Sequence, residues 1–253
     1  MVIGLMSAMP EELELALHEL ADGPLLGFEH GGRTFHTGRM CGRECVAVFS
    51  RWGKVAAATT ATELISRFGV QAIVFTGVAG GLAPGLHVGD IVVADKLYQH
   101  DMDARPLFPR FEVPLTGRAG LETDASIRES LVRAASAFVE DACGAAGGGI
   151  GPAPGRRPRV VVGTVVSGDR FIARASEAAE LRAAIEGAVC VEMEGAAVAQ
   201  VCAEYGVPFG VVRVISDAAD EHAPGTFHSF VETVASRYSV GIARRFLLGR
   251  RNL

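Results

Sequence analysis

The chain lacks the features that mark membrane, secreted and nucleic-acid-binding proteins. No apolar run approaches the roughly 18 residues needed to cross a bilayer, and no charged segment precedes an apolar stretch at the N-terminus. We therefore expect no membrane span and no signal peptide. The net charge of −5 also argues against nucleic-acid binding, because contacts to phosphates require basic residues.

Cysteine is scarce and shows no disulfide framework. The five cysteines are odd in number and stand mostly in apolar surroundings, which predicts free thiols in a reducing cytoplasm. Cys41 and Cys45 have a loose metal-like spacing, but no second Cys/His pair of matching spacing is nearby. We expect a cytoplasmic protein without a metal site.

A recognisable phosphate-binding loop is also missing. The glycine-rich segment TGVAGGLAPGLHVGD, Thr76–Asp90, follows a buried strand, but it contains neither a Walker A sequence nor GxGxxG. Its glycines predict tight turns, or else places where the backbone approaches a ligand closely. After the first strand, SAMPEELE places Glu11 and Glu12 where a phosphate site would need cations or bare amides. Either glutamate could instead occupy the first turn of a helix, where the macrodipole favours negative charge, and Glu11 fits that interpretation well. We expect no cofactor.

What the chain does have is a regular alternation of short apolar runs and amphipathic stretches. Hydrophobic residues make up 49% of the 253 positions, enough to bury a large core in one domain over residues 1–253. The alternation predicts an α/β sandwich with helices on both faces of a sheet, and residues 144–159 are expected to form a mobile surface loop. Strands are expected at 2–6, 34–39, 44–50, 72–76, 91–94, 160–166, 189–192 and 209–216, and helices at 10–20, 54–68, 126–143, 177–184, 195–205 and 227–248.

Three acidic clusters stand at predicted strand ends. VVRVISD ends at Asp217, VCVEMEG contains Glu192 and Glu194, and Glu11 and Glu12 follow the first strand. Ligands of open α/β sheets bind at the carboxyl edge of the strands. An isolated aspartate there could simply cap the next turn, or it could be held ready to give a proton to a bound ligand. The occurrence of three such clusters favours a functional site.

The order of these motifs resembles a known family. AMPEE, TGVAGGL, VGDIVVAD, His100-Asp101, SGDRFI, VEMEG and VRVISDAAD follow one another as in the purine nucleoside phosphorylase/hydrolase family. Within it, the chain is similar to the bacterial 5′-methylthioadenosine/S-adenosylhomocysteine nucleosidases over nearly its whole length. The resemblance implies a three-layer αβα sandwich with a mixed central sheet, and hydrolysis of the bond between adenine and ribose in methionine salvage.

The resemblance also assigns roles to individual residues. Asp217 would protonate the adenine ring nitrogen, and burial would help it keep its proton. Glu12 would activate water on the other face of the sugar, as in inverting glycoside hydrolysis. Glu194 would hold the ribose 2′ and 3′ hydroxyls, unless it only caps the helix beginning at Gly195. The remaining substrate-binding residues would be Met9, Val78, Phe171, Ile172, Glu192, Met193, Arg213, Ser216 and Phe227, with Phe171 packing on adenine or serving as an ordinary core aromatic.

Two departures and one loop concern the 5′ end of the substrate. Val78 stands where these nucleosidases often have serine, and Trp52 stands where a smaller aliphatic residue is common. The apolar loop from Pro106 to Phe111 either packs on its own domain or, as the resemblance implies, contributes to a homodimer interface and reaches the partner's pocket.

Three alternatives remain at this point. A phosphorylase of the same fold would use phosphate instead of water, which Glu11 and Glu12 disfavour. An aminodeoxyfutalosine nucleosidase would share adenine and ribose and differ only in the 5′ group. A nucleoside-binding sensor without turnover would not need both a base at Glu12 and an acid at Asp217.

Overall fold

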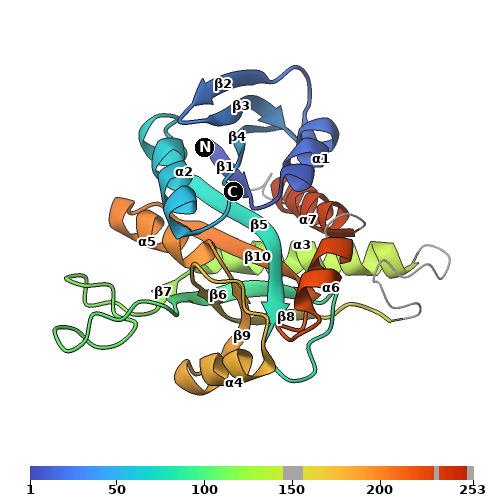
Figure 1. The fold of residues 1–253 in the computed structure, drawn as a ribbon. Coiled ribbons are helices and arrows are strands. Elements are labelled where there is room, and N and C mark those ends of the chain that lie inside the picture. Colours follow the sequence, from blue (N-terminus) through green and yellow to red (C-terminus); the bar gives the residue numbers. More distant parts are fainter. Residues whose placement is uncertain (145–155, 231–233, 250–253) are drawn as a thin grey trace.

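The fold is built on one mixed β-sheet. The computed structural model describes residues 1–144, 156–230 and 234–249, and the ten strands among them form a single sheet (Figure 1). The parallel pairs are β1–β4, β1–β5, β5–β10, β6–β8 and β8–β9. The antiparallel pairs include β2–β3, β3–β4, β5–β9 and β6–β10. The strands are β1 (Ile3–Ser7), β2 (Leu26–His30), β3 (Arg33–Met40), β4 (Arg43–Phe49), β5 (Ala72–Gly81), β6 (Ile91–Gln99), β7 (Leu121–Glu122), β8 (Val160–Ser167), β9 (Ala188–Glu192) and β10 (Phe209–Asp217).

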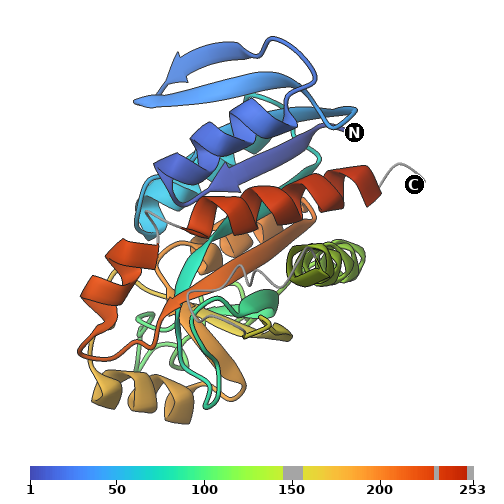
Figure 2. The ribbon, with the colours of Figure 1, turned by 90° about the vertical axis from the view of Figure 1, so that its right-hand side faces the viewer.

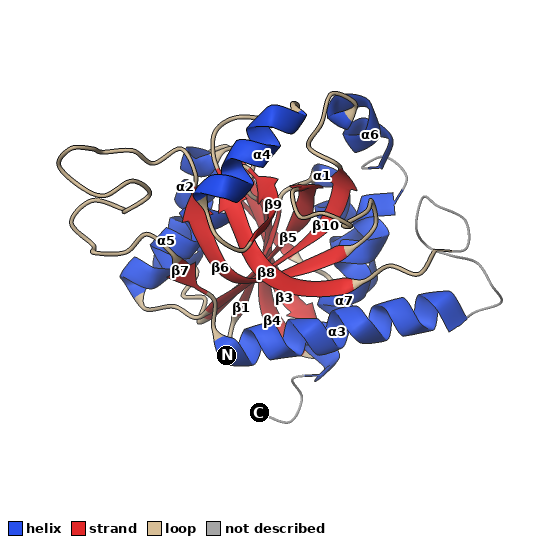
Figure 3. Ribbon diagram, turned by 90° about the horizontal axis from the view of Figure 1, so that it is seen from below, coloured by secondary structure: helices blue, strands red, loops and turns tan. Residues whose placement is uncertain are grey.

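Part of this sheet closes on itself. Strand β5 pairs with both β9 and β10, and the series β10, β6, β8, β9 returns to β5, so five strands form a ring that Figure 3 shows end-on. The strands of this ring are almost wholly buried, which explains their near-continuous apolar sequences. The sequence predicts the helices and the mixed sheet, and both are confirmed, but it gives no sign that the sheet curls into a ring.

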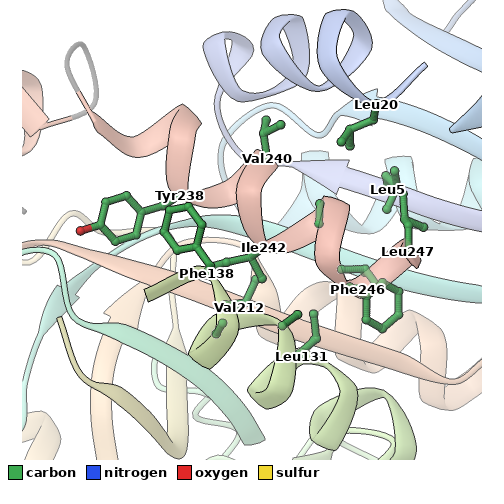
Figure 4. Close-up of a cluster of buried hydrophobic side chains, with 14 of the residues drawn as sticks. Leu5, Leu20, Leu131, Phe138, Val212, Tyr238, Val240, Ile242, Phe246 and Leu247 are labelled. Carbon is green, nitrogen blue, oxygen red and sulfur yellow. The ribbon is translucent and has the colours of Figure 1, made fainter. Parts of the chain in front are cut away.

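Helices cover the sheet on both sides. Helices α2 and α5 pack on one side, and α1, α3 and α7 on the other (Figure 1). In the second group, Val240, Ile242 and Phe246 of α7 pack among Leu5, Leu20, Leu131 and Phe138 (Figure 4). The helices are α1 (Pro10–Leu20), α2 (Lys54–Ser66), α3 (Ala125–Gly144), α4 (Ala175–Ala184), α5 (Gly195–Tyr205), α6 (Ala223–Phe230) and α7 (Ser236–Gly249).

Several predicted elements need correction. Strand β5 continues through Gly77, Gly80 and Gly81, so the tight turns expected at these glycines are wrong, whereas the turns expected at Gly85 and Gly89, which have positive φ, are confirmed. The single closing helix expected at 227–248 begins earlier, at Ala223, and α6 and α7 run in different directions on either side of residues 231–233 (Figure 2). The edge strand β2 was not predicted, because its residues are mostly exposed and show no apolar alternation.

The loop expected over 144–159 falls largely outside the described residues, which omit 145–155. Its described end is held by the buried carboxylate of Asp90, which accepts hydrogen bonds from Arg156 Nη2 at 2.8 Å and from the Arg159 amide at 2.8 Å. No helix in the described part of the chain is long and apolar enough to cross a membrane. The same residues bring together no group of three or more His, Cys, Asp or Glu suited to hold a metal ion.

Candidate active site

A pocket lies where the ends of β5, β9 and β10 meet the segments that follow β1 and β4. Most of the predicted site residues contribute to its wall, whereas Glu12 and Arg213 do not. The lining residues are Ala8, Met9, Trp52, Val78, Ala79, Gly80, Arg170, Phe171, Ile172, Val191, Glu192, Met193, Glu194, Ser216, Asp217 and Phe227. The motifs that lie far apart in the sequence therefore form one site.

Asp217 is a buried carboxyl without a cationic hydrogen-bond partner among the described residues. It is the last residue of β10 and is 2% exposed. Its Oδ2 accepts a hydrogen bond from Ser216 Oγ at 2.8 Å, and its Oδ1 accepts one from the Ala219 amide at 2.9 Å. Burial raises the pKa of Asp217 above its ordinary value, although these two bonds work in the opposite direction. The carboxyl thus fixes the turn after β10 and also keeps its proton more readily than an exposed aspartate does.

The glycines of β5 make room for this arrangement. A Cβ at Gly80 would lie 2.9 Å from Asp217 Oδ1, and one at Gly77 would lie 2.9 Å from the Ala8 Cβ and 3.3 Å from Arg213 Cζ. Since β5 is the neighbour of both β1 and β10, these two positions let side chains from either strand approach its backbone. The glycines of TGVAGG therefore serve close side-chain packing at the pocket.

Arg213 and Glu192 form a fully enclosed ion pair behind the pocket wall. The guanidinium of Arg213 donates to Glu192 Oε2 from Nη2 at 2.8 Å, and it lies over the Phe75 ring at 4.1 Å. Glu192 also accepts from the Gly195 amide at 2.8 Å, so this glutamate caps α5. Glu192 still reaches the pocket wall, whereas Arg213 is 0% exposed. A direct contact between Arg213 and substrate remains a prediction.

Glu194 has a different environment from Glu192. Strand β9 ends at Glu192, and Glu194 takes the N-cap position of α5 but makes no side-chain cap bond. Its Oε1 accepts a hydrogen bond from the Gly53 amide at 2.8 Å instead. Burial, followed by repulsion from Glu192, raises the pKa of Glu194. The capping explanation therefore applies to Glu192, and the carboxyl of Glu194 faces the pocket.

Aromatic side chains form the remaining wall. Phe227 of α6 makes edge-to-face contacts with Phe171 and with Trp52, at centroid distances of 5.7 and 6.5 Å. The Trp52 indole N–H donates to the Ala8 carbonyl at 2.9 Å, yet Trp52 is 59% exposed. Phe171 is 44% exposed, so it is not an ordinary core aromatic. These rings present flat apolar surface to the pocket.

Glu12 lies beside the pocket in an enclosed site of its own. Glu11 is exposed, but Glu12 is 1% exposed and lines a small cavity together with Ser7, Thr76 and Ser239. Ser7 and Ser239 each donate a hydrogen bond to its carboxylate, at 2.7 and 2.6 Å. Burial raises the pKa of Glu12, and these two bonds partly offset the increase. Sequence reasoning selects Glu12 over Glu11 but misses Ser239, which is 227 positions away.

The loop from Pro106 to Phe111 divides into two parts. Phe111 is buried in its own chain, 9% exposed, with Arg110 4.5 Å above its ring. Leu107 is 83% exposed. The expectation that the loop packs on its own domain therefore holds for Phe111, whereas the homodimer interface stays a prediction.

Comparison with known proteins places the chain in a family. A family model described as the phosphorylase superfamily matches residues 2–247. The 5′-methylthioadenosine/S-adenosylhomocysteine nucleosidase of Colwellia psychrerythraea is 37% identical over 93% of this chain and 91% of its own length. The enzyme of the same name from Mycobacterium bovis is 36% identical over 92% of each chain.

A solved structure extends the likeness to three dimensions. The nucleosidase of that name from Neisseria meningitidis, in complex with methylthio-immucillin-A, superposes with a TM-score of 0.86. It is 30% identical and covers 98% of this chain and 99% of that one. The chain therefore belongs to the phosphorylase superfamily.

Proposed function

We propose that this protein hydrolyses the N-glycosidic bond of 5′-methylthioadenosine and S-adenosylhomocysteine, releasing adenine and the corresponding thioribose. The observation that carries the proposal is the pocket itself. It combines Asp217, a carboxyl whose pKa burial raises, with Glu194, a second carboxyl placed for hydroxyl groups, between walls of aromatic and methionine side chains. The names of the three relatives described above agree with this substrate class.

In the proposed reaction, Asp217 gives its proton to an adenine ring nitrogen as the bond between that base and C1′ breaks. The base then leaves neutral, and Ser216 orients the carboxyl through its 2.8 Å hydrogen bond. Water supplies the new C1′–O bond, and its proton passes to Glu12. Glu194 binds the two ribose hydroxyls and stabilises the positive charge that develops on the sugar.

Hydrolysis fits the charges around the pocket better than phosphorolysis does. Arg170 reaches the pocket wall, but its guanidinium is bound to Glu177 at 2.5 Å. Arg213 is bound to Glu192. Arg170 is the only cation among the described lining residues, so an anionic nucleophile would meet no unpaired positive charge at this wall.

Identification of the products tests this proposal. Methylthioadenosine is incubated with the protein with and without inorganic phosphate, and the products are separated by chromatography. We expect free adenine and methylthioribose at the same rate in both cases. Formation of methylthioribose-1-phosphate would establish phosphorolysis instead, and release of adenine only from aminodeoxyfutalosine would establish the other nucleosidase activity.

We also propose that the protein acts in the cytoplasm, in methionine salvage, and as a homodimer. Leu107 is exposed, and Pro106 and Pro109 flank the apolar pair Leu107-Phe108. This apolar segment supports an interface at the loop. Leu107→Asp should convert a dimer to a monomer in sedimentation and raise KM for methylthioadenosine more than for adenosine, which lacks the alkylthio group. Phe111 is unsuitable for this test, because its substitution would disturb the core. A wild-type chain that sediments as a fully active monomer would contradict the interface.

A further inference from the structure

The carboxylate of Glu12 is held by two hydroxyl groups from opposite ends of the chain. Ser7, the last residue of β1, donates to Oε2 at 2.7 Å, and Ser239 of α7 donates to Oε1 at 2.6 Å. Both serines are buried, at 6% and 3% exposure. Each carboxylate oxygen thus has one hydroxyl donor and retains further lone-pair capacity.

The Ser7 hydroxyl has a second partner that it cannot serve at the same time. Ser7 Oγ lies 2.9 Å from the Met9 carbonyl oxygen, and the Met9 amide donates to Ser7 Oγ at 3.3 Å. A serine has a single proton to donate but two lone pairs with which to accept. While Glu12 is ionised, that proton is directed to Oε2. Once Oε2 carries a proton, the bond can reverse, with Glu12 donating to Ser7 and Ser7 donating to the Met9 carbonyl.

The Ser239 hydroxyl is fixed by the helix that carries it. Its neighbours Tyr238 and Val240 are buried, at 0% and 2% exposure, and pack within the core between α1 and α3 (Figure 4). The helix cannot shift Ser239 without disturbing this packing. The other charged groups that act on Glu12 are Arg213 of β10 and Glu11 of α1, and they act in opposite directions.

We propose that Ser7 and Ser239 are positioning residues for Glu12 in the hydrolytic reaction, and that Ser7 changes from hydrogen-bond donor to acceptor when Glu12 takes the proton of the attacking water. This inference rests on the proposed function. The water oxygen forms the bond to C1′, its proton moves to Glu12 Oε2, and the Ser7 proton turns to the Met9 carbonyl, so no hydroxyl loses its own proton. Glu12 returns the proton to solvent when the products leave. Because Met9 also lines the main pocket, this exchange links the base to the pocket wall.

The two serines should have different effects on the pH dependence of turnover. Ser239 stabilises the carboxylate more than the neutral acid, so Ser239→Ala should raise the pKa of Glu12 and move the acid limb of kcat/KM to higher pH. Ser7 serves both protonation states, so Ser7→Ala should lower kcat with a smaller movement of that limb. We expect each variant to lose about tenfold in kcat, with KM for methylthioadenosine nearly unchanged, as for the loss of one hydrogen bond to a charged group.

The experiment compares these variants with Ser236→Ala, which removes a half-buried hydroxyl from the same helix one turn earlier. Ser239→Cys keeps a side chain of similar volume but is a poor hydrogen-bond donor, and it replaces Ser239→Ala if that variant does not fold. Ser239→Thr keeps the hydroxyl donor and should show the wild-type acid limb of kcat/KM. If the wild-type protein is active, and if Ser7→Ala and Ser239→Ala (or Ser239→Cys) keep the wild-type kcat and pH profile, the positioning role is overturned while the proposed function stands. Equal movement of the acid limb by the two alanine variants would overturn the donor-to-acceptor change. Absence of adenine release by the wild-type protein would overturn the proposed function together with this inference.

Discussion

Asp90, directly before β6, and Asp217, the last residue of the neighbouring strand β10, are buried aspartates whose surroundings shift their pKa values in opposite directions. Asp90 stands directly before β6, and its backbone carbonyl accepts a hydrogen bond from the amide of Ile215, two residues before Asp217. The Asp90 carboxylate binds Arg156 and Arg159 at 2.8 and 3.3 Å. Burial would raise its pKa, but the amides of Arg159 and His87 and the Arg156 guanidinium outweigh burial and lower it. Asp217 has no such cation among its described hydrogen-bond partners, and its pKa is raised.

The comparison separates two uses of a buried carboxyl. A carboxylate that is bound by a cation and by backbone amides connects parts of the fold, as in Asp90 and Glu192. Where burial outweighs the groups that favour ionisation, the carboxyl is available for proton transfer, as we propose for Asp217 and Glu12. Mutations at the two kinds of site should therefore change different measured quantities.

Asp217→Asn should have the largest effect on activity. The amide cannot protonate the leaving adenine, so kcat should fall by about 10²–10⁴. The free energy of unfolding should not fall, because in the wild-type protein at pH 7 the raised pKa of buried Asp217 destabilises the folded state. That group favours the folded state below its unfolded pKa and loses this contribution as pH rises through the folded pKa. Thermal unfolding at pH 7 should show a gain of up to about 1 kcal/mol for the variant, and near-wild-type turnover would contradict the acid role.

Glu12→Gln should come next and should be compared with Glu11→Gln. The two residues are adjacent and chemically alike, but Glu12 is buried and Glu11 is exposed. Glu12→Gln should reduce hydrolysis by a large factor, although a smaller one than Asp217→Asn does, whereas Glu11→Gln should change kcat less than about twofold, as for a surface substitution. In the wild-type enzyme, activity should fall as pH decreases through the raised pKa of Glu12. The reverse ranking of the two variants would assign the base to the wrong glutamate.

Glu194→Gln should reduce both binding and turnover, by a smaller factor than the loss of either proton-transfer group. Its carboxylate is proposed to accept hydrogen bonds from two ribose hydroxyls, and the loss of charge-assisted bonds costs about 1.5–3 kcal/mol. The 2′-deoxy substrate should therefore react poorly with the wild-type enzyme, and the variant should discriminate less between the two forms. Equal kcat/KM for ribo and deoxy substrates in the wild-type enzyme would remove the proposed role.

Asp90→Asn should have the smallest effect on kcat and should lower stability instead. Its charge-assisted bonds to Arg156 and Arg159 are weakened, but both arginines are partly exposed, at 27% and 54% of the side chain, so they are left hydrated. We expect a loss of about 2 kcal/mol in the free energy of unfolding. Because the pKa of Asp90 is lowered in the folded state, the difference from wild type should be present at pH 7 and should shrink as pH falls through the folded pKa. Denaturant titrations at several pH values measure this difference.

The sequence alone predicts much of the site because the site consists of strand ends. Asp217, Glu192 and Glu194 follow apolar runs, and β9 and β10 both pair with β5 at Gly80, which brings these strand ends together. The family that these motifs indicate is confirmed by the comparisons with known proteins. The resemblance selects Glu12 over Glu11, and the three-dimensional packing adds that Glu12 is buried whereas Glu11 is exposed.

Other features depend on contacts that leave no local pattern. Ser239 reaches Glu12 because α7 crosses beside α1, and nothing near either residue in the sequence indicates this. Closure of the strand ring depends on β5 pairing with both β9 and β10, which the apolar pattern of β5 does not reveal. The glycines of β5 predict turns by composition, but side-chain crowding from β1 and β10 accounts for Gly77 and Gly80.

The most direct test of this distinction is a pH titration of the two aspartates in the folded protein. Carboxyl-carbon NMR of protein carrying isotopically labelled aspartate, with signals assigned from Asp90→Asn and Asp217→Asn, follows both groups under one set of conditions. The account predicts that Asp217 titrates above the ordinary aspartate range and that Asp90 titrates below it. An Asp217 signal that titrates at or below that of Asp90 would contradict it.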